Sequence, residues 1–139
     1  MTFITWEPRY EIGVEFVDRQ HKQLVDIINR LHDSMESGAS QRVLDHIFAD
    51  LEVYTETHFR DEERYLAESN YPDLERHKGA HVQFIDRIRQ MRERFMANDM
   101  VANQVLLYLK NWLTLHILGT DRQYANYFER GEGKNAAAG

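Results

Sequence analysis

Long amphipathic stretches with few breaks are the feature that most constrains how this chain can fold. Its 139 residues contain two prolines, Pro8 and Pro72, and both lie outside the periodic stretches. Apolar residues recur with helical spacing over about residues 18–36 and 41–66, from just after Pro72 to Phe95, and from near Met100 to Phe128. The links ESGAS, ESNYPD and MANDM are short. Because short links make successive long helices antiparallel, we expect an all-α, up-down-up-down four-helix bundle.

The ends of the chain differ in composition from the periodic stretches. Residues 1–17 are rich in aromatic side chains, and we expect an N-terminal arm packed on the bundle. Asp18 is expected to cap the first helix, and residues 18–130 to form the bundle. The small, polar segment 131–139 is expected to be a flexible tail.

Composition excludes several classes of function. The net charge is −6 and no helix face is dominated by Lys and Arg, so nucleic acid is not an expected partner. No apolar run has membrane-spanning length, and no signal peptide is recognisable, so we expect a cytoplasmic protein without membrane insertion. The polar helix faces show no wide apolar patch, which favours a monomer. Because cysteine is absent, any metal site must use His, Asp, Glu or Tyr.

Five of the seven histidines are predicted to point into the core. The pairs His58/Glu62 and His77/His81 are each four residues apart, so the members of a pair lie about 40° apart on one helix face. His21 lies on the apolar stripe of the first helix. Buried polar groups rarely go without partners.

These inward residues are also predicted to share one level of the bundle. His21 is near the start of the first helix, His58 and Glu62 near the end of the second, and His77 and His81 near the start of the third. His116 continues the apolar stripe of the fourth helix, in its later half. In an antiparallel bundle all these positions meet at the same end of the core.

Asp121 follows His116 by five residues, which is a poor spacing for a regular helix. The two side chains would diverge by about 140° on an α-helix. A π-bulge would bring them together, and such bulges gather at functional sites. We therefore predict a π-bulge between residues 116 and 121, which adds a second carboxylate to the inward set.

Five imidazoles and two carboxylates are more than one metal ion needs. They suit two ions, with three imidazoles on one, two on the other, and both carboxylates bridging. Imidazole and carboxylate ligands suit Fe, Zn, Mn or Cu. The ion with fewer ligands would keep an open position for a small ligand. His32 lies roughly 16 Å along the helix from His21 and His46 faces solvent, so neither is expected to join the site.

The motifs DRQHKQL, HFRDEE, HKGAH and HILGTD resemble those of the hemerythrin family, in particular its single-domain bacterial members. The resemblance extends over roughly residues 4–128, and none of the seven ligand positions is replaced. It implies a non-haem di-iron centre with an oxo or hydroxo bridge that binds O2 reversibly. It also implies that His77, His81 and His116 hold one iron and that His21 and His58 hold the second, which has the open position. Glu62 and Asp121 would bridge the two irons.

Further roles follow from the resemblance. The apolar side chains beside the ligands, which are also candidates for ordinary core residues, are expected to form the O2 pocket: Leu24, Phe59, Trp112, Leu113 and Ile117. Tyr10 on the arm and Tyr124, one turn past Asp121, are expected to contact the ligands from outside the metal site.

The expected function is an oxygen carrier or store, which in one hypothesis delivers O2 to an oxygen-consuming enzyme. An alternative is a di-iron oxidase or an enzyme that handles peroxide or nitric oxide, and a third is an O2 or iron sensor. Ferritin-like di-iron enzymes use four carboxylates and two Glu-x-x-His motifs. Because this chain contains no Glu-x-x-His, we expect that it is not an enzyme.

Overall fold

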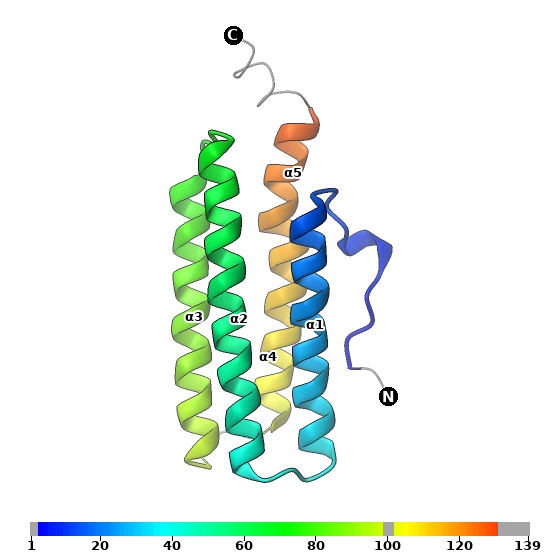
Figure 1. Cartoon of the computed structure of the whole chain (residues 1–139), viewed down its shortest axis with the longest axis vertical. Helices are drawn as coiled ribbons and strands as arrows, with labels where there is room; N and C mark the ends of the chain where they lie inside the picture. The colour runs from blue at the N-terminus through cyan, green and yellow to red at the C-terminus, as the bar shows by residue number, and fades with distance from the viewer. Residues whose placement is uncertain (1–2, 99–101, 131–139) are drawn as a thin grey trace.

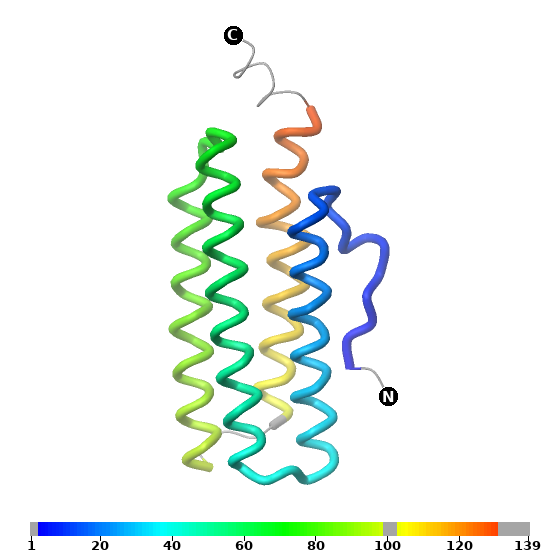
Figure 2. The backbone as a smooth tube through the Cα atoms, in the orientation of Figure 1, coloured from blue at the N-terminus to red at the C-terminus, as the bar shows by residue number. Residues whose placement is uncertain are grey.

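The computed structural model describes residues 3–98 and 102–130, and the elements in those ranges are all helical. Three helical columns are α1 (Glu15–Glu36), α2 (Gln41–Glu68) and α3 (Leu74–Met96). The fourth column is continuous from α4 (Ala102–Leu115) through the π-helical segment η2 (His116–Asp121) to α5 (Arg122–Glu129). Successive columns run in opposite directions (Figures 1 and 2), which confirms the predicted up-down-up-down bundle. The predicted start near Met100 lies outside the described residues.

Left-handed residues end three of the helices and keep the links short. Gly38, Asn70 and Asn98 all have positive φ, between 57° and 73°, directly after α1, α2 and α3. The backbone amide of Tyr71 donates to the carbonyl of Leu66 at 3.0 Å, which closes the Schellman turn after α2. These turns reverse the chain within a few residues, so neighbouring helices pack antiparallel.

The first helix begins at Glu15, so the prediction that Asp18 caps it was wrong. Val14 occupies the cap position and makes no side-chain cap bond. The carboxylate of Asp18 instead accepts hydrogen bonds from the backbone amides of Ile12 at 2.9 Å and Gly13 at 3.1 Å. Asp18 thus accepts hydrogen bonds from free backbone amides, as a cap residue does. These amides belong to residues before the helix and not to its first turn.

The arm before α1 runs along the outside of the bundle beside that helix (Figure 1). It contains one 3-10 turn, η1 (Pro8–Tyr10). The side chain of Asn29 makes two hydrogen bonds with the backbone of Ile4, of 2.7 and 2.9 Å. At its other end, Arg122 of α5 donates to the backbone carbonyls of Arg9 and Glu11. The predicted tail, 131–139, lies outside the described residues.

The core changes character along the bundle. Toward the α1–α2 link the largest fully buried side chains are apolar: Leu31, Phe48, Leu51, Ile88, Met91 and Leu109. Toward the α2–α3 link the core also contains buried polar side chains: His21, His58, Glu62, His77, His81, His116 and Asp121. Within the described ranges, no helix has both the length and the apolar character needed to cross a membrane.

Candidate metal centre

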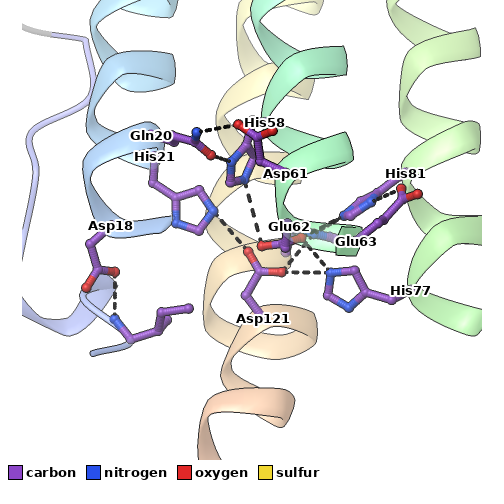
Figure 3. A network of polar contacts seen from close by, with 12 residues as sticks. Asp18, Gln20, His21, His58, Asp61, Glu62, Glu63, His77, His81 and Asp121 are labelled. Atoms are coloured by element: carbon purple, nitrogen blue, oxygen red, sulfur yellow. Dashed lines mark hydrogen bonds and ion pairs between the residues drawn. The ribbon is translucent and has the colours of Figure 1, made fainter. Parts of the chain in front are cut away.

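All seven predicted ligand residues converge at one level of the core, and none is more than 6% exposed. They come from every column of the bundle. Figure 3 shows His21 on α1 and His58 on α2 on one side and His77 and His81 on α3 on the other, with Glu62 and Asp121 between them. These residues therefore share one level of the core, as predicted from the sequence. That they are metal ligands stays a prediction.

The segment His116–Asp121 is a π-helix, as the five-residue spacing predicted. On a regular α-helix the two side chains would point about 140° apart. The wider π turn instead brings the Nε2 atom of His116 within 3.0 Å of the Oδ1 atom of Asp121. The π segment therefore puts both side chains of the fourth column into one site.

Glu62 divides its two oxygens between two groups of imidazoles. Its Oε1 atom lies 2.7 Å from Nε2 of His77 and 3.0 Å from Nε2 of His81. Its Oε2 atom faces the other side, 3.8 Å from Nε2 of His58. One carboxylate thus faces imidazoles of α3 with one oxygen and an imidazole of its own helix with the other.

Asp121 makes the same division from the opposite wall of the site. Its Oδ1 atom lies 3.1 Å from Nε2 of His77 and 3.0 Å from Nε2 of His116. Its Oδ2 atom lies 3.0 Å from Nε2 of His21. Both carboxylates therefore present one oxygen to the group His77, His81 and His116, and one oxygen to the group His21 and His58.

Several of these short approaches lack the alignment of hydrogen bonds. Both oxygens of Asp121, and the Nε2 atoms of His21 and His58, are buried with no hydrogen-bond partner. Buried polar atoms without partners are costly. These nitrogen and oxygen atoms lie close together but do not hydrogen-bond to one another. Donor atoms around a metal ion are arranged in this way, because their lone pairs point at the ion. Metal–ligand bonds of about 2.1 Å at right angles place neighbouring donor atoms roughly 3.0 Å apart, so the residues fit metal ions.

The carboxylates and imidazoles also shift one another's pKa. Burial lowers the pKa of His58 to about 4. Burial would also lower the pKa of His77, but the carboxylates of Asp121 and Glu62 outweigh it and raise that pKa to about 9. Burial would raise the pKa of Asp121, whereas His116 and the other imidazoles hold it well below its usual range. Burial would likewise raise the pKa of Glu62, but hydrogen bonds from His77 and His81 lower it, so both carboxylates stay ionised for a cation.

Two imidazoles are hydrogen-bonded on their outer nitrogen by side chains that were not predicted from the sequence. The Nδ1 atom of His58 is 2.6 Å from Oε1 of Gln20, whose Nε2 atom donates to Asp61 at 3.0 Å. The Nδ1 atom of His81 is 2.8 Å from Oε2 of Glu63. These partners lie 38 and 18 residues from their histidines, so spacing along the chain does not pair them. The available signal is adjacency, because Gln20 precedes His21 and Glu63 follows Glu62.

The predicted pocket residues line the core around the ligands. Four of the five are buried, and Trp112 is half-buried. The ring of Phe59 stacks on His81 with 3.7 Å between centroids, and Trp112 stacks on His116 at 4.4 Å. Leu24 and Leu113 lie one helical turn from His21 and His116. Their role as an O2 pocket stays a prediction.

The two predicted tyrosine partners behave differently. The hydroxyl of Tyr124, which is fully buried, donates to Oε2 of Glu62 at 3.0 Å. Burial, with the nearby Glu62 carboxylate, raises the pKa of Tyr124 well above 10, so this hydroxyl remains a donor. The hydroxyl of Tyr10 instead donates to Glu7 at 2.8 Å, within the arm. The structure therefore does not place Tyr10 against the ligands, because the arm satisfies its polar atom locally.

The two remaining histidines stay outside the site, as predicted. His32 stacks on Phe3 of the arm with 4.8 Å between ring centroids, and its Nδ1 atom lies 3.3 Å from Asp33. His46 is exposed on α2.

Comparisons with known proteins agree with this geometry. The family described as "Hemerythrin HHE cation binding domain" matches residues 12–128. Bacteriohemerythrin of Stenotrophomonas maltophilia is 33% identical over 129 residues, which cover 91% of this chain and 82% of that protein. Myohemerythrin of Theromyzon tessulatum is 29% identical over 119 residues, covering 86% and 88%. A crystal structure of wild-type hemerythrin superposes with a TM-score of 0.81 at 27% identity, covering 89% of this chain and 96% of that one. The chain belongs to the hemerythrin family.

Proposed function

We propose that this chain binds O2 reversibly at a non-haem di-iron centre and serves as an oxygen carrier or store. The observation that carries the proposal is the orientation of the two buried carboxylates. Glu62 and Asp121 each direct one oxygen toward each of the two imidazole groups. Membership of the hemerythrin family supports iron as the metal and O2 as the ligand.

In this proposal the three imidazoles of His77, His81 and His116 hold one iron, and those of His21 and His58 hold the other. Glu62 and Asp121 would each bind both ions, together with an oxo or hydroxo group. The first position then has five protein donors and the second has four. The second position, between α1 and α2, would therefore be the one with room for a small ligand.

When bound, the iron pair supplies the electrons that hold O2 reversibly. The protein contributes mostly neutral imidazole donors, with two carboxylates shared between two ions. Di-iron enzymes of the ferritin type place four carboxylates on their metals, and so stabilise higher charge on the ions. The donor set here favours the ferrous state, which supports a carrier rather than an enzyme.

The apolar side chains around the ligands keep water from the centre. Leu24, Leu113 and Ile117 are each at most 3% exposed. A hydrophobic shell controls solvent access to a metal site, and O2, being apolar, enters such a shell more readily than water or protons do. Phe59 and Trp112, stacked on His81 and His116, also keep those two rings in place.

The test is metal analysis followed by an anaerobic optical titration. We expect two irons per chain, and a visible charge-transfer band that appears when O2 is admitted to the reduced protein and fades when O2 is removed. A band that does not reverse, or peroxide released into solution, would favour the enzyme alternative. A chain that takes up no iron would overturn the proposal.

His58→Ala tests the second metal position, with His46→Ala as a matched control. His58 is one of two imidazoles proposed for that position, so its loss should abolish reversible O2 binding. His46 is an exposed histidine on the same helix, and its loss should leave the titration unchanged. Reversible O2 binding by His58→Ala would show that the ligand assignment is wrong.

Delivery to an oxygen-consuming enzyme and a monomeric state remain predictions. Gel filtration of the iron-loaded chain, with and without O2, measures its oligomeric state directly. A change of oligomeric state with O2 would instead favour the sensor alternative.

A further inference from the structure

We propose that Gln20 and Glu63 are positioning residues that make the two metal positions electronically unequal, with a neutral amide behind His58 and a carboxylate behind His81. The contacts that carry this inference are between protein atoms (Figure 3). Its meaning for O2 binding rests on the proposed function.

The orientation of the Gln20 amide follows from its neighbour Asp61. An ionised carboxylate only accepts hydrogen bonds, so the amide nitrogen of Gln20 must face Asp61, at 3.0 Å. The amide oxygen therefore faces Nδ1 of His58, at 2.6 Å. Because that oxygen also only accepts, the Nδ1 atom of His58 must carry the proton. Asp61 thus dictates, through Gln20, which nitrogen of His58 is protonated.

The inner nitrogen of His58 is then left without a proton. With its proton on Nδ1, the neutral ring has a lone pair on Nε2. That atom is the one buried in the site with no hydrogen-bond partner. Gln20 therefore presents His58 to a metal with its lone pair already directed inward.

His81 is held in the same orientation by a partner with a charge. Oε2 of Glu63 accepts from Nδ1 of His81 at 2.8 Å, which leaves Nε2 to face the site. Glu63 also lines a surface hollow of about 310 Å³ beside Phe59 and His81. The ring of His81 is thus fixed between the stacked ring of Phe59 and the carboxylate of Glu63.

An amide and a carboxylate differ in charge, and the charge of the outer partner changes how strongly the imidazole ring donates to a metal ion. A negative charge behind an imidazole makes the ring a stronger donor and stabilises a more highly charged ion. Glu63 would therefore favour the ferric state of the iron that His77, His81 and His116 hold. Gln20 adds no charge behind His58, so the iron that meets O2 would be held more readily in its ferrous state.

The first test needs no metal and no variant. A long-range proton–nitrogen NMR spectrum of the metal-free chain, labelled with nitrogen-15 in histidine, reports the protonated nitrogen of each ring. We expect His58 to be protonated on Nδ1. Protonation of His58 on Nε2 would overturn the inference.

The second test moves the charge while conserving net charge and hydrogen bonding. In the double variant Gln20→Glu with Asp61→Asn, the new carboxylate faces His58 and the new amide donates to it. Titration with Co²⁺ is followed by its visible spectrum. One of the two equivalents of Co²⁺ should bind at least about tenfold more tightly than in the unchanged chain, since outer partners of metal ligands change affinity by about 10–100-fold. Glu63→Gln should weaken one equivalent instead. Autoxidation of the iron-loaded double variant should be faster.

The matched control is Gln23→Glu with Asp26→Asn, which makes the same two changes at exposed positions of α1. Circular dichroism checks that each variant is folded. If the double variant binds Co²⁺ as the control does, Gln20 does not tune the site. Because NMR and Co²⁺ binding require neither iron nor O2, the inference can fail while the carrier proposal stands, and the reverse.

Discussion

At one end of the bundle the core is apolar, and at the other it holds five imidazoles and two carboxylates at the same degree of burial. The apolar end stabilises the fold mainly by hydrophobic burial. The polar end removes charged and polar groups from water, which costs free energy unless other charges compensate. In the same four columns, therefore, one end of the core mainly stabilises the fold and the other end holds the candidate functional site. Metal binding should therefore act mainly on one end.

Metal loading is expected to give the largest effect. A ligand that binds only the folded chain stabilises it by about 4 kcal/mol per ion when free metal exceeds Kd about a thousandfold. Urea unfolding of the loaded and metal-free chain measures the difference. If both forms unfold at the same urea concentration, the polar end does not depend on metal.

Phe48→Ala tests the apolar end. Phe48 is fully buried and packs near Phe95, with 5.8 Å between ring centroids. The cavity should cost about 3–5 kcal/mol of unfolding free energy. The loss should be the same with and without metal, because Phe48 lies far from the site. Val53→Ala, at a position 64% exposed, is the control and should change stability by less than about 0.5 kcal/mol. If the loss of unfolding free energy differed between the loaded and metal-free forms, the two ends of the core would be energetically coupled.

His21→Leu should break the comparison by making the polar end more like the apolar one. His21 is 1% exposed, and neither of its ring nitrogens has a hydrogen-bond partner. The substitution removes the imidazole that lies 3.0 Å from Oδ2 of Asp121, and a buried carboxylate that loses a partner is costly, so the metal-free chain should lose about 1–3 kcal/mol. Metal uptake at the second position should be lost. A variant more stable than the unchanged metal-free chain would show that Asp121 does not depend on His21.

Asp45→Asn gives the smallest expected effect and concerns the surface near the apolar end. Arg92 binds both oxygens of Asp45, at 2.7 and 3.1 Å, and these hydrogen bonds lower the pKa of Asp45 below its usual 3.8. A lowered pKa adds stability above the unfolded value, and this stability is lost as pH falls through the folded value. Since Asp45 is 44% exposed, Asp45→Asn should cost at most about 1 kcal/mol at pH 7.

Urea unfolding at pH 7 and near pH 3 checks this sign. The difference between Asp45→Asn and the unchanged chain should shrink at the lower pH. A difference that persists or grows at low pH would contradict the assignment to the Arg92 pair.

Much of the site was predictable because its pattern is local. The four-residue spacing of His58/Glu62 and His77/His81 puts each pair on one helix face whatever packs against it. The five-residue spacing of His116 and Asp121 predicted the π segment for the same reason. The start of α1 was predicted wrongly because Asp18 binds amides of the arm, which no helical period describes.

The sequence by itself determined the helices, their antiparallel order and the level at which seven ligand-type side chains meet. These follow from backbone periodicity and short links, which depend on residues close together in the chain. Only the tertiary structure decided which carboxylate oxygen faces which imidazole, and that an amide stands behind His58 but a carboxylate behind His81. Such pairings join different helices across tens of residues, and side-chain packing between helices sets their register to within a hydrogen-bond length.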